Sequence, residues 1–319
     1  QQRGISVSTA VMQFQYKNHL INLLDTPGHA DFSEDTYRTL SAVDAALMVI
    51  DGAKGVEPRT LKLAQICRKR NMPIITLINK MDRTGADFFR TLEMMTERLG
   101  TTAIPVQLPI GSAEQFSGVV DLISLKGIAW DEANYGTTMH EIDIPEEMMR
   151  MVSEYREKLI ETIVEWDDDL LAKYFDGIEL SEEEIRAGLR KATLSGSVVP
   201  VLCGSALKNK GVQPLLDAIV SYLPSPVDVP PISGLNPKTQ ETRERLPHDD
   251  EPFCALAFKI MTDPHVGKLT FLRVYSGVLT RGATVYNSTH GKRERIGRLM
   301  QMHANKREER DAVYAGDIV

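Results

Sequence analysis

Three short polar motifs each follow directly after a short apolar stretch, and they constrain the fold more than any other feature of this chain. They are Asp25-Thr26-Pro27-Gly28-His29, Asn79-Lys80-Met81-Asp82 and Gly204-Ser205-Ala206-Leu207-Lys208. Apolar stretches that alternate with helical patterns are typical of a parallel sheet covered by helices on both faces. Because such sheets bind ligands at the carboxyl ends of their strands, the three motifs are candidate parts of one binding site.

The other patterns predict the elements around this sheet. Strand-like residues on either side of Lys17-Asn18 predict a hairpin over 5–24, and short apolar runs predict strands at 45–50, 73–78 and 197–203. Residue periodicity, a first-turn proline and a capping-box sequence predict five helices, which span 58–70, 86–99, 145–166, 181–194 and 212–222. We therefore expect an α/β domain over 1–223 with an insert at about 104–195, a linker at 224–250, and a β-barrel domain, cut short, at 251–319.

Charge is distributed unevenly along the chain, although the formal net charge is only −7. The segment from Glu141 to Glu184 holds 16 acidic and 4 basic residues, whereas Lys259 to Arg310 holds 11 basic and 4 acidic residues. This asymmetry predicts two surfaces with different partners, although each could also be an ordinary solvated face. No apolar run is long enough to span a membrane, and the three scattered cysteines indicate buried free thiols in a reducing cytoplasm.

The first motif combines a carboxylate with a nearby glycine. Asp25 at the end of a strand can hold a hydrated Mg²⁺, and Gly28 allows a backbone N–H to approach a phosphate oxygen closely. Taken alone, this pattern is also explained by ordinary turn chemistry, since Pro-Gly is a common turn pair.

The second and third motifs have the groups that recognise a guanine base. The Asp82 carboxylate can accept two N–H bonds from the guanine edge, Asn79 can bond the base or tie neighbouring loops, and the Lys80 stem can lie over the purine ring. The turn at Ser205–Leu207 can offer a backbone N–H to the guanine carbonyl. The alternative for the second motif is a solvated turn in which Asp82 caps a helix.

Together with Arg3-Gly4-Ile5-Ser6, these motifs resemble the motif set of the translational GTPases. Residues 84–319 resemble bacterial elongation factor G, for example in Gln107–Gly111 and Leu269–Gly277. Residues 3–83 look more like the peptide-release-factor GTPase, release factor three, for example in Asp31–Leu40. The two resemblances therefore indicate a mosaic sequence, in which the two parts meet near residues 79–85.

The resemblance implies roles for individual residues. Ser6 and Asp25 would hold Mg²⁺, the Gly28 N–H would sense the γ-phosphate, and His29 would position the attacking water. Asn79, Lys80, Asp82, Ser205, Ala206 and Leu207 would bind the guanine of GTP or GDP. His29 could also be an ordinary surface histidine, and we interpret His303 as structural.

The resemblance also implies a ribosome partner. The acidic insert would contact the ribosomal stalk protein, and the basic barrel surface (Lys292, Arg293, Arg295, Arg298, Lys306, Arg307 and Arg310) would contact ribosomal RNA. We expect a cytoplasmic monomer that does not associate with membranes.

A phosphate-binding motif of the form G-x-x-x-x-G-K-[ST] is absent from the 319 residues. We therefore expect a fragment, truncated at both ends, that lacks the first strand of its sheet and does not hydrolyse GTP unaided. The parent protein is expected to be a ribosome-stimulated GTPase that drives translocation. The alternatives are a release-factor-recycling or ribosome-protection GTPase, and a non-hydrolysing ribosome-binding module.

Overall fold

The computed structural model of the chain describes residues 9–27, 33–236, 239–263, 267–303 and 306–319. The chain forms two compact units. One comprises Ala45–Leu223, and the other combines Gln1–Asp44 with Pro224–Val319. The two units are described in turn.

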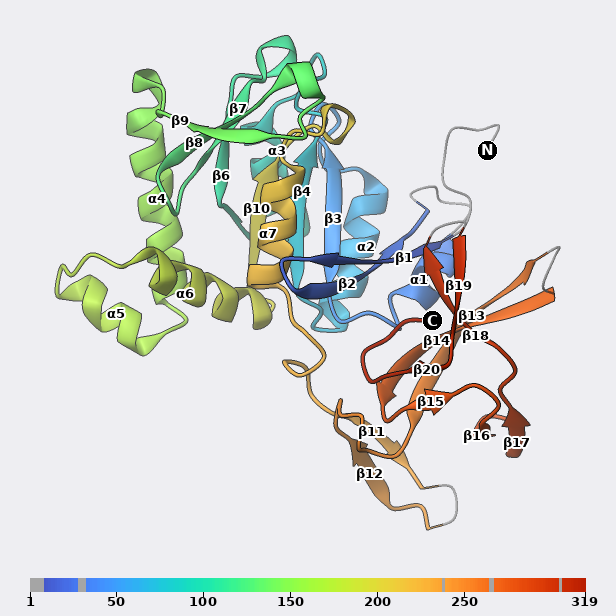
Figure 1. Cartoon of the computed structure of the whole chain (residues 1–319). Coiled ribbons are helices and arrows are strands. Elements are labelled where there is room, and N and C mark those ends of the chain that lie inside the picture. The colour runs from blue at the N-terminus through green and yellow to red at the C-terminus, as the bar shows by residue number, and fades with distance from the viewer. Residues whose placement is uncertain (1–8, 28–32, 237–238, 264–266, 304–305) are drawn as a thin grey trace. The chain divides into compact units, whose positions relative to one another are not determined.

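A four-stranded parallel sheet forms the centre of the first unit (Figure 1). Its order is β3 (Ala46–Asp51), β4 (Ile74–Asn79), β10 (Val198–Cys203) and β5 (Thr102–Pro105). Every residue of β10, and all of β4 except Asn79, is buried, as expected for strands that are covered on both faces. The predicted parallel α/β sheet is therefore confirmed.

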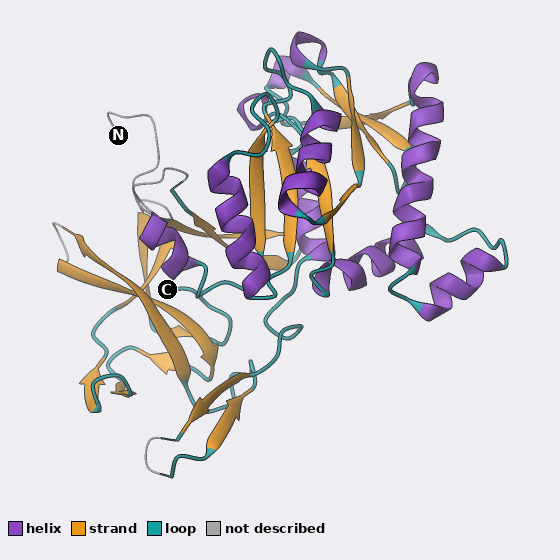
Figure 2. Cartoon of the chain, turned by 180° about the vertical axis from the view of Figure 1, so that it is seen from behind, coloured by secondary structure: helices purple, strands orange, loops and turns teal. Residues whose placement is uncertain are grey.

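Helices flank this sheet (Figure 2), and their limits match the sequence patterns closely. Helix α2 (Pro58–Lys69) contacts β3, and α7 (Val212–Tyr222) contacts β4. The helix predicted at 86–99 is α3 (Phe88–Met94), continued by a π-helical turn (Met95–Leu99). It ends at Gly100, whose φ of 59° is the left-handed conformation that glycine adopts readily.

The insert contains a four-stranded antiparallel sheet followed by three helices. The strands are β6 (Gln107–Ile110), β7 (Gly118–Asp121), β8 (Lys126–Trp130) and β9 (Met139–Ile142). The helices are α4 (Met149–Val164), α5 (Asp168–Phe175) and α6 (Glu182–Leu194). The predicted capping box is present, because the Ser181 and Glu184 side chains each bond the other's backbone N–H. Helix α5 was not predicted, although Asp167 caps it.

The second unit begins with the predicted hairpin. Strands β1 (Ala10–Tyr16) and β2 (His19–Asp25) pair in antiparallel register, and the positive φ angles of Lys17 and Asn18 form the turn. Among the described residues, β2 pairs only with β1, and β3 pairs only with β4.

Apolar packing explains why the first 44 residues belong to this unit, whereas 1–223 was expected to form one domain. Val11 of β1 and Ala42, which follows α1 (Ser33–Thr39), are buried in a cluster with Phe258, Phe271 and Ile318. By its contacts, the chain is thus divided after Asp44 and again after Leu223.

The rest of the second unit is β-rich. A long hairpin, β13 (Cys254–Asp263) with β14 (Gly267–Ser276), is followed by three shorter pairs. These are β15 (Leu279–Thr280) with β20 (Ala312–Val313), β16 (Thr284–Asn287) with β17 (Lys292–Arg295), and β18 (Leu299–His303) with β19 (Lys306–Arg310). A parallel-sheet domain followed by a β-rich domain is the predicted fold class.

The segment 224–250, for which the sequence predicts a linker, contains regular structure. It contains a hairpin of β11 (Ile232–Leu235) and β12 (Thr242–Arg245). Most of its residues are exposed, and β12 reads Thr-Arg-Glu-Arg. Because the strands bury almost no apolar side chain, the sequence has no alternating pattern that could predict them.

Candidate guanine-nucleotide site

The loops after β3, β4 and β10 lie side by side at one edge of the parallel sheet (Figure 1). Strands β3 and β4 are in register through the pair Asp51 and Asn79, and β4 and β10 are in register through Ile78 and Cys203. The motifs beginning at Asn79 and at Gly204 therefore start at the same level of the sheet. The sequence prediction that these two motifs share one edge is confirmed.

Asn79 ties these two loops together, which is one of the two roles expected for it. Its side-chain oxygen accepts the Lys80 N–H at 2.8 Å and the Ala206 N–H at 2.9 Å. The backbones add a second connection, because the Met81 N–H donates to the Gly204 carbonyl at 3.1 Å. Bonds between the loops fix their spacing before any ligand binds, which lowers the ordering cost of binding.

Asp82 lies on this edge as a partly exposed carboxylate. Among the residues that the structure describes, its side chain has no hydrogen-bond or ion-pair partner. The alternative in which Asp82 caps the next helix is wrong, because Asp87 caps α3 by accepting the Arg90 N–H at 2.9 Å. The Asp82 carboxylate is thus available to accept two N–H donors from a ligand.

The loop at Ser205–Leu207 offers fewer backbone donors than its sequence suggests. The Ser205 N–H donates to the Lys210 carbonyl at 2.9 Å, and the Ala206 N–H is bonded to Asn79. The Leu207 N–H has no such partner in the described part of the chain, and the Leu207 side chain is 90% exposed. Leu207 is therefore the backbone position that can donate to a ligand without breaking an existing bond.

The Ser205 hydroxyl is a buried polar group of the same loop. Ser205 is fully buried, and its Oγ has no hydrogen-bond partner within the described residues. A buried polar atom without a partner is rare and costly unless a ligand or an ordered water satisfies it. The Asp82 carboxylate, which is partly exposed, fits a ligand that is rich in N–H donors, such as a guanine base.

Two glycines allow the backbone of this loop to turn back on itself. A Cβ at Gly204 would lie 2.5 Å from the Lys210 carbonyl oxygen, and one at Gly211 would lie 2.7 Å from the Cys203 carbonyl oxygen. Gly211 also has a φ of 88°, a backbone conformation that residues other than glycine rarely adopt. The loop therefore requires glycine at both positions for steric reasons.

Comparison with protein families agrees with this geometry. Residues 1–225 match the model for the elongation factor Tu GTP binding domain, and residues 252–319 match the model for elongation factor G domain 2. The chain belongs to the translational GTPases. A crystal structure of a protein from Thermus thermophilus has a similar fold, with a TM-score of 0.83 and 26% identity. The similarity covers 99% of this translational GTPase but only 44% of that protein.

The phosphate-binding half of the site is described only in part. Asp25 is the exposed last residue of β2 and belongs to the second unit, while Ser6, Gly28 and His29 lie outside the described residues. Within the described part of this translational GTPase, no group of three or more His, Cys, Asp or Glu side chains could hold a metal ion. The Mg²⁺ ligands therefore remain a prediction.

Asp51 is a charged residue of the site that sequence reasoning missed. Its Oδ2 accepts the Lys80 Nζ at 2.8 Å, and its Oδ1 accepts the Ala53 N–H at 3.0 Å. Burial raises the pKa of this carboxyl, but the bonds from Lys80 and Ala53 outweigh it and hold the pKa below its ordinary value. A carboxylate that directly follows the apolar run 45–50 was the signal that could have identified it.

The cysteines of this translational GTPase are free thiols, as expected. Cys67 and Cys203 are buried, and Cys254 is partly buried. Burial raises the pKa of the Cys203 thiol well above its ordinary value, so this thiol is inert.

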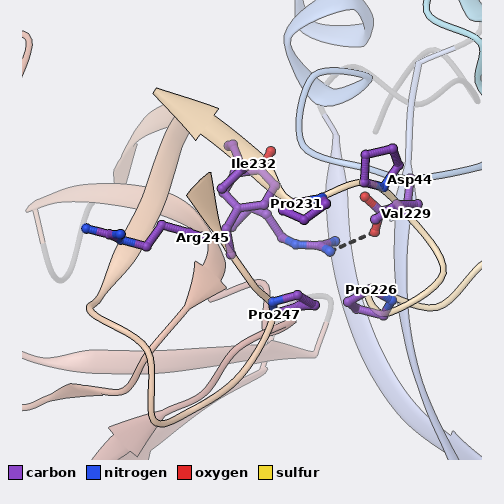
Figure 3. Close-up of a pocket in the computed structure, with 10 residues that line it drawn as sticks. Asp44, Pro226, Val229, Pro231, Ile232, Arg245 and Pro247 are labelled. Carbon is purple, nitrogen blue, oxygen red and sulfur yellow. Dashed lines mark hydrogen bonds and ion pairs between the residues drawn. The ribbon is translucent and has the colours of Figure 1, made fainter. Parts of the chain in front are cut away.

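A pocket of about 200 Å³ lies in the second unit (Figure 3). Prolines form much of its wall, and its charged pair is Arg273 and Asp44, which are 2.7 Å apart. The Arg273 guanidinium also lies 5.5 Å from the Tyr275 ring centroid.

The described part of this translational GTPase contains no helix with the length and apolar character of a membrane span.

Proposed function

We propose that the edge formed by Asn79, Lys80, Asp82 and Ser205–Leu207 binds the base of a guanine nucleotide. The observation that supports this most directly is the Asp82 carboxylate, which lacks a partner among the described residues beside loops that Asn79 has already joined. Guanine has adjacent N–H and NH₂ donors that match this carboxylate, whereas adenine has no such pair. The family match to a GTP-binding domain supports the same ligand.

Binding of guanosine 5′-monophosphate to the 319-residue chain tests this proposal, because this ligand places little demand on the phosphate-binding half. Titration followed by NMR chemical shifts should show binding at least about tenfold tighter than that of adenosine 5′-monophosphate. Equal affinity for the two nucleotides would remove the basis for the proposal.

The match to a GTP-binding domain also supports a ribosome-stimulated GTPase activity, which would need a phosphate half beside the base-binding edge. Ser6 and Asp25 would hold Mg²⁺, which would supply positive charge to neutralise the phosphates. The Gly28 N–H would contact the γ-phosphate, and His29 would position the attacking water. In this proposal, residues 1–223 form the GTP-binding domain, with its insert at about 104–195. The segment 224–250 connects it to a β-barrel domain that starts at residue 251.

The work done by GTP hydrolysis is ribosomal translocation. The match of residues 252–319 to elongation factor G domain 2 supports this choice. The release-factor-three-like segment at 3–83 favours release-factor recycling instead. An assay that follows messenger RNA movement on the ribosome with the full-length protein separates them. GTP-dependent movement by one codon supports translocation, whereas release-factor departure without movement supports recycling.

Ribosome contact involves the basic surface of the second unit. Lys292, Arg293 and Arg295 of β17 are exposed and lack ion-pair partners in the described part of the chain. Arg298 and Arg310, by contrast, lie 3.5 Å from Glu309 and 3.3 Å from Glu308. We therefore assign ribosomal RNA contact mainly to β17, and contact with the ribosomal stalk protein to the acidic helices of the insert. The protein acts as a monomer in the cytoplasm.

Cosedimentation with ribosomes at several salt concentrations tests this assignment. Exchanging Lys292, Arg293 and Arg295 for Gln should weaken binding, because up to three phosphate contacts are lost. The slope of log affinity against log salt concentration should become shallower by about 0.7–0.9 for each lost contact. The control exchanges Arg298 and Arg310 for Gln, which removes two cations that acidic neighbours already neutralise. If both variants behave alike, β17 is not the RNA-binding strand.

A further inference from the structure

Asp51 lies at the end of β3, next to the proposed base-binding loops, and four donors converge on its carboxylate. Oδ2 accepts Lys80 Nζ at 2.8 Å and lies 3.5 Å from Arg83 Nη1. Oδ1 accepts the N–H groups of Ala53 at 3.0 Å and Lys54 at 3.3 Å. Its side chain is only 9% exposed. The carboxylate is therefore held in place from both sides and cannot swing freely into solvent.

This arrangement fixes both ends of Lys80. At its backbone end, Lys80 has a φ of 63°, and its N–H is bonded to the Asn79 side chain at 2.8 Å. At its far end, Nζ is bonded to Asp51 on the neighbouring strand. The four-carbon stem thus runs from the end of β4 to the end of β3, along the carboxyl edge of the sheet and away from β10.

We propose that Asp51 is a positioning residue for guanine binding, which it assists by holding the Lys80 stem across this edge. The inference rests on the proposed base-binding function of the same edge. A free lysine side chain samples many rotamers, and ordering it on binding costs free energy. The ion pair with Asp51 orders the stem before the ligand arrives, so the apolar methylenes are already in place to cover a purine ring.

An ion pair that competes with the ligand for Lys80 would have the opposite effect on affinity. If the ion pair held Lys80 away from the ligand, breaking it would release the lysine and tighten nucleotide binding. The sign of the change in affinity therefore separates a positioning role from a competing one.

The test is the affinity of the 319-residue chain for guanosine 5′-monophosphate, measured by NMR titration for the wild type and for Asp51→Asn. We expect about fivefold weaker binding in the variant. The Lys80 side chain is 50% exposed, so the pair is treated as an exposed ion pair, and a fivefold loss is near the upper limit for such pairs. In a Lys80→Met background, the same Asp51→Asn exchange should change the affinity by less than about twofold, since Asp51 acts through Lys80. Unchanged or tighter binding in Asp51→Asn would overturn the inference, and so would an equal loss in the Lys80→Met background.

Asp121→Asn is the matched control for the turn. The Asp121 Oδ1 accepts the N–H groups of Ile123 and Ser124, both at 2.8 Å, at the end of β7. This turn copies the one at Asp51 but has no lysine of the guanine site. Asp121→Asn should leave the nucleotide affinity unchanged, and a loss equal to that of Asp51→Asn would show that the effect arises from turn stability.

A conservative variant covers the case in which Asp51→Asn does not fold. Asp51→Glu keeps the charge but moves the carboxylate by one methylene, so it should bind more weakly than the wild type through a misplaced Lys80. Wild-type affinity in Asp51→Glu would contradict positioning. Failure of the wild type to prefer guanosine over adenosine monophosphate would instead defeat the proposed function itself, so the two failures are distinguishable.

Discussion

Lys259 of β13 forms a buried ion pair whose loss should loosen helix α1. Its Nζ lies 2.9 Å from the Asp35 carboxylate and 3.3 Å from the Thr9 carbonyl oxygen, and its side chain is 7% exposed. Asp35 lies in α1, and it also accepts the Thr9 N–H at 2.8 Å and the Thr9 hydroxyl at 2.7 Å. One carboxylate therefore joins β13, the helix and the residue just before β1.

The loss of stability caused by Lys259→Met depends on the bonds that Asp35 keeps in the variant. Breaking a fully buried pair costs about 3–5 kcal/mol because the remaining charge is left uncompensated. Asp35 is 25% exposed and keeps both bonds from Thr9, so we expect a smaller cost of about 2 kcal/mol. Methionine preserves the apolar stem of the lysine, so the change in stability reports mainly the loss of its charge.

Amide hydrogen exchange measured on peptides that cover 33–42 tests this value. A loss of about 2 kcal/mol predicts about 30-fold faster exchange when opening and closing are fast relative to chemical exchange, because the rate then follows the opening equilibrium. Lys268→Met is the control, because Lys268 is an exposed residue of β14 with no ion-pair partner in the described part of the chain. Equal exchange in wild type and Lys259→Met would refute the proposed anchoring of α1.

The same carboxylate gives the anchor a pH dependence. Burial raises the pKa of Asp35, but the bonds from Lys259 and Thr9 outweigh it and leave the pKa below its ordinary value. A lowered folded-state pKa stabilises the fold above the ordinary carboxyl pKa, and this contribution disappears as the pH falls through the folded-state value. Protection of 33–42 should therefore fall in this acidic range in the wild type, and less so in Asp35→Asn.

Three further predictions concern the first unit and the chain as a whole. Gly211→Ala should destabilise the chain by more than about 1 kcal/mol and weaken guanosine monophosphate binding, whereas the control Gly177→Ala adds a Cβ with no atom within 4 Å and should preserve binding. Ser181→Ala removes a capping box and should cost about 1 kcal/mol in urea unfolding followed by tryptophan fluorescence, since Trp130 and Trp166 both lie in this unit. The 319-residue chain should turn over no GTP with ribosomes, because its sequence lacks a phosphate-binding motif. Turnover by the purified chain would contradict this.

Sequence patterns predicted the elements that bury apolar side chains. Both limits of α7 were predicted correctly, and the capping box located the start of α6. Strands β11 and β12 could not be predicted because they are exposed and polar. Helix α5 was missed because it spans only eight residues, which is too short for a clear helical period.

Within the site, sequence placed the loops but not their hydrogen bonds. The motif at Asn79 and the motif at Gly204 were correctly expected to share one edge. The commitment of the Ala206 N–H to Asn79 and the ion pair of Lys80 with Asp51 depend on backbone geometry and on residues distant in sequence. Such pairings have no local signal in a single sequence, so only the structure could show them.

Exchange of Asp82 for Asn tests the central claim most directly, because it changes the hydrogen-bonding pattern of one side chain at constant size. Guanine presents an NH₂ donor where xanthine presents a carbonyl acceptor, and an asparagine can donate where an aspartate can only accept. We predict that the wild-type chain prefers guanosine over xanthosine 5′-monophosphate and that Asp82→Asn reverses this preference. Loss of both ligands without reversal, or an unchanged preference for guanosine, would contradict the assignment of this edge as a guanine site.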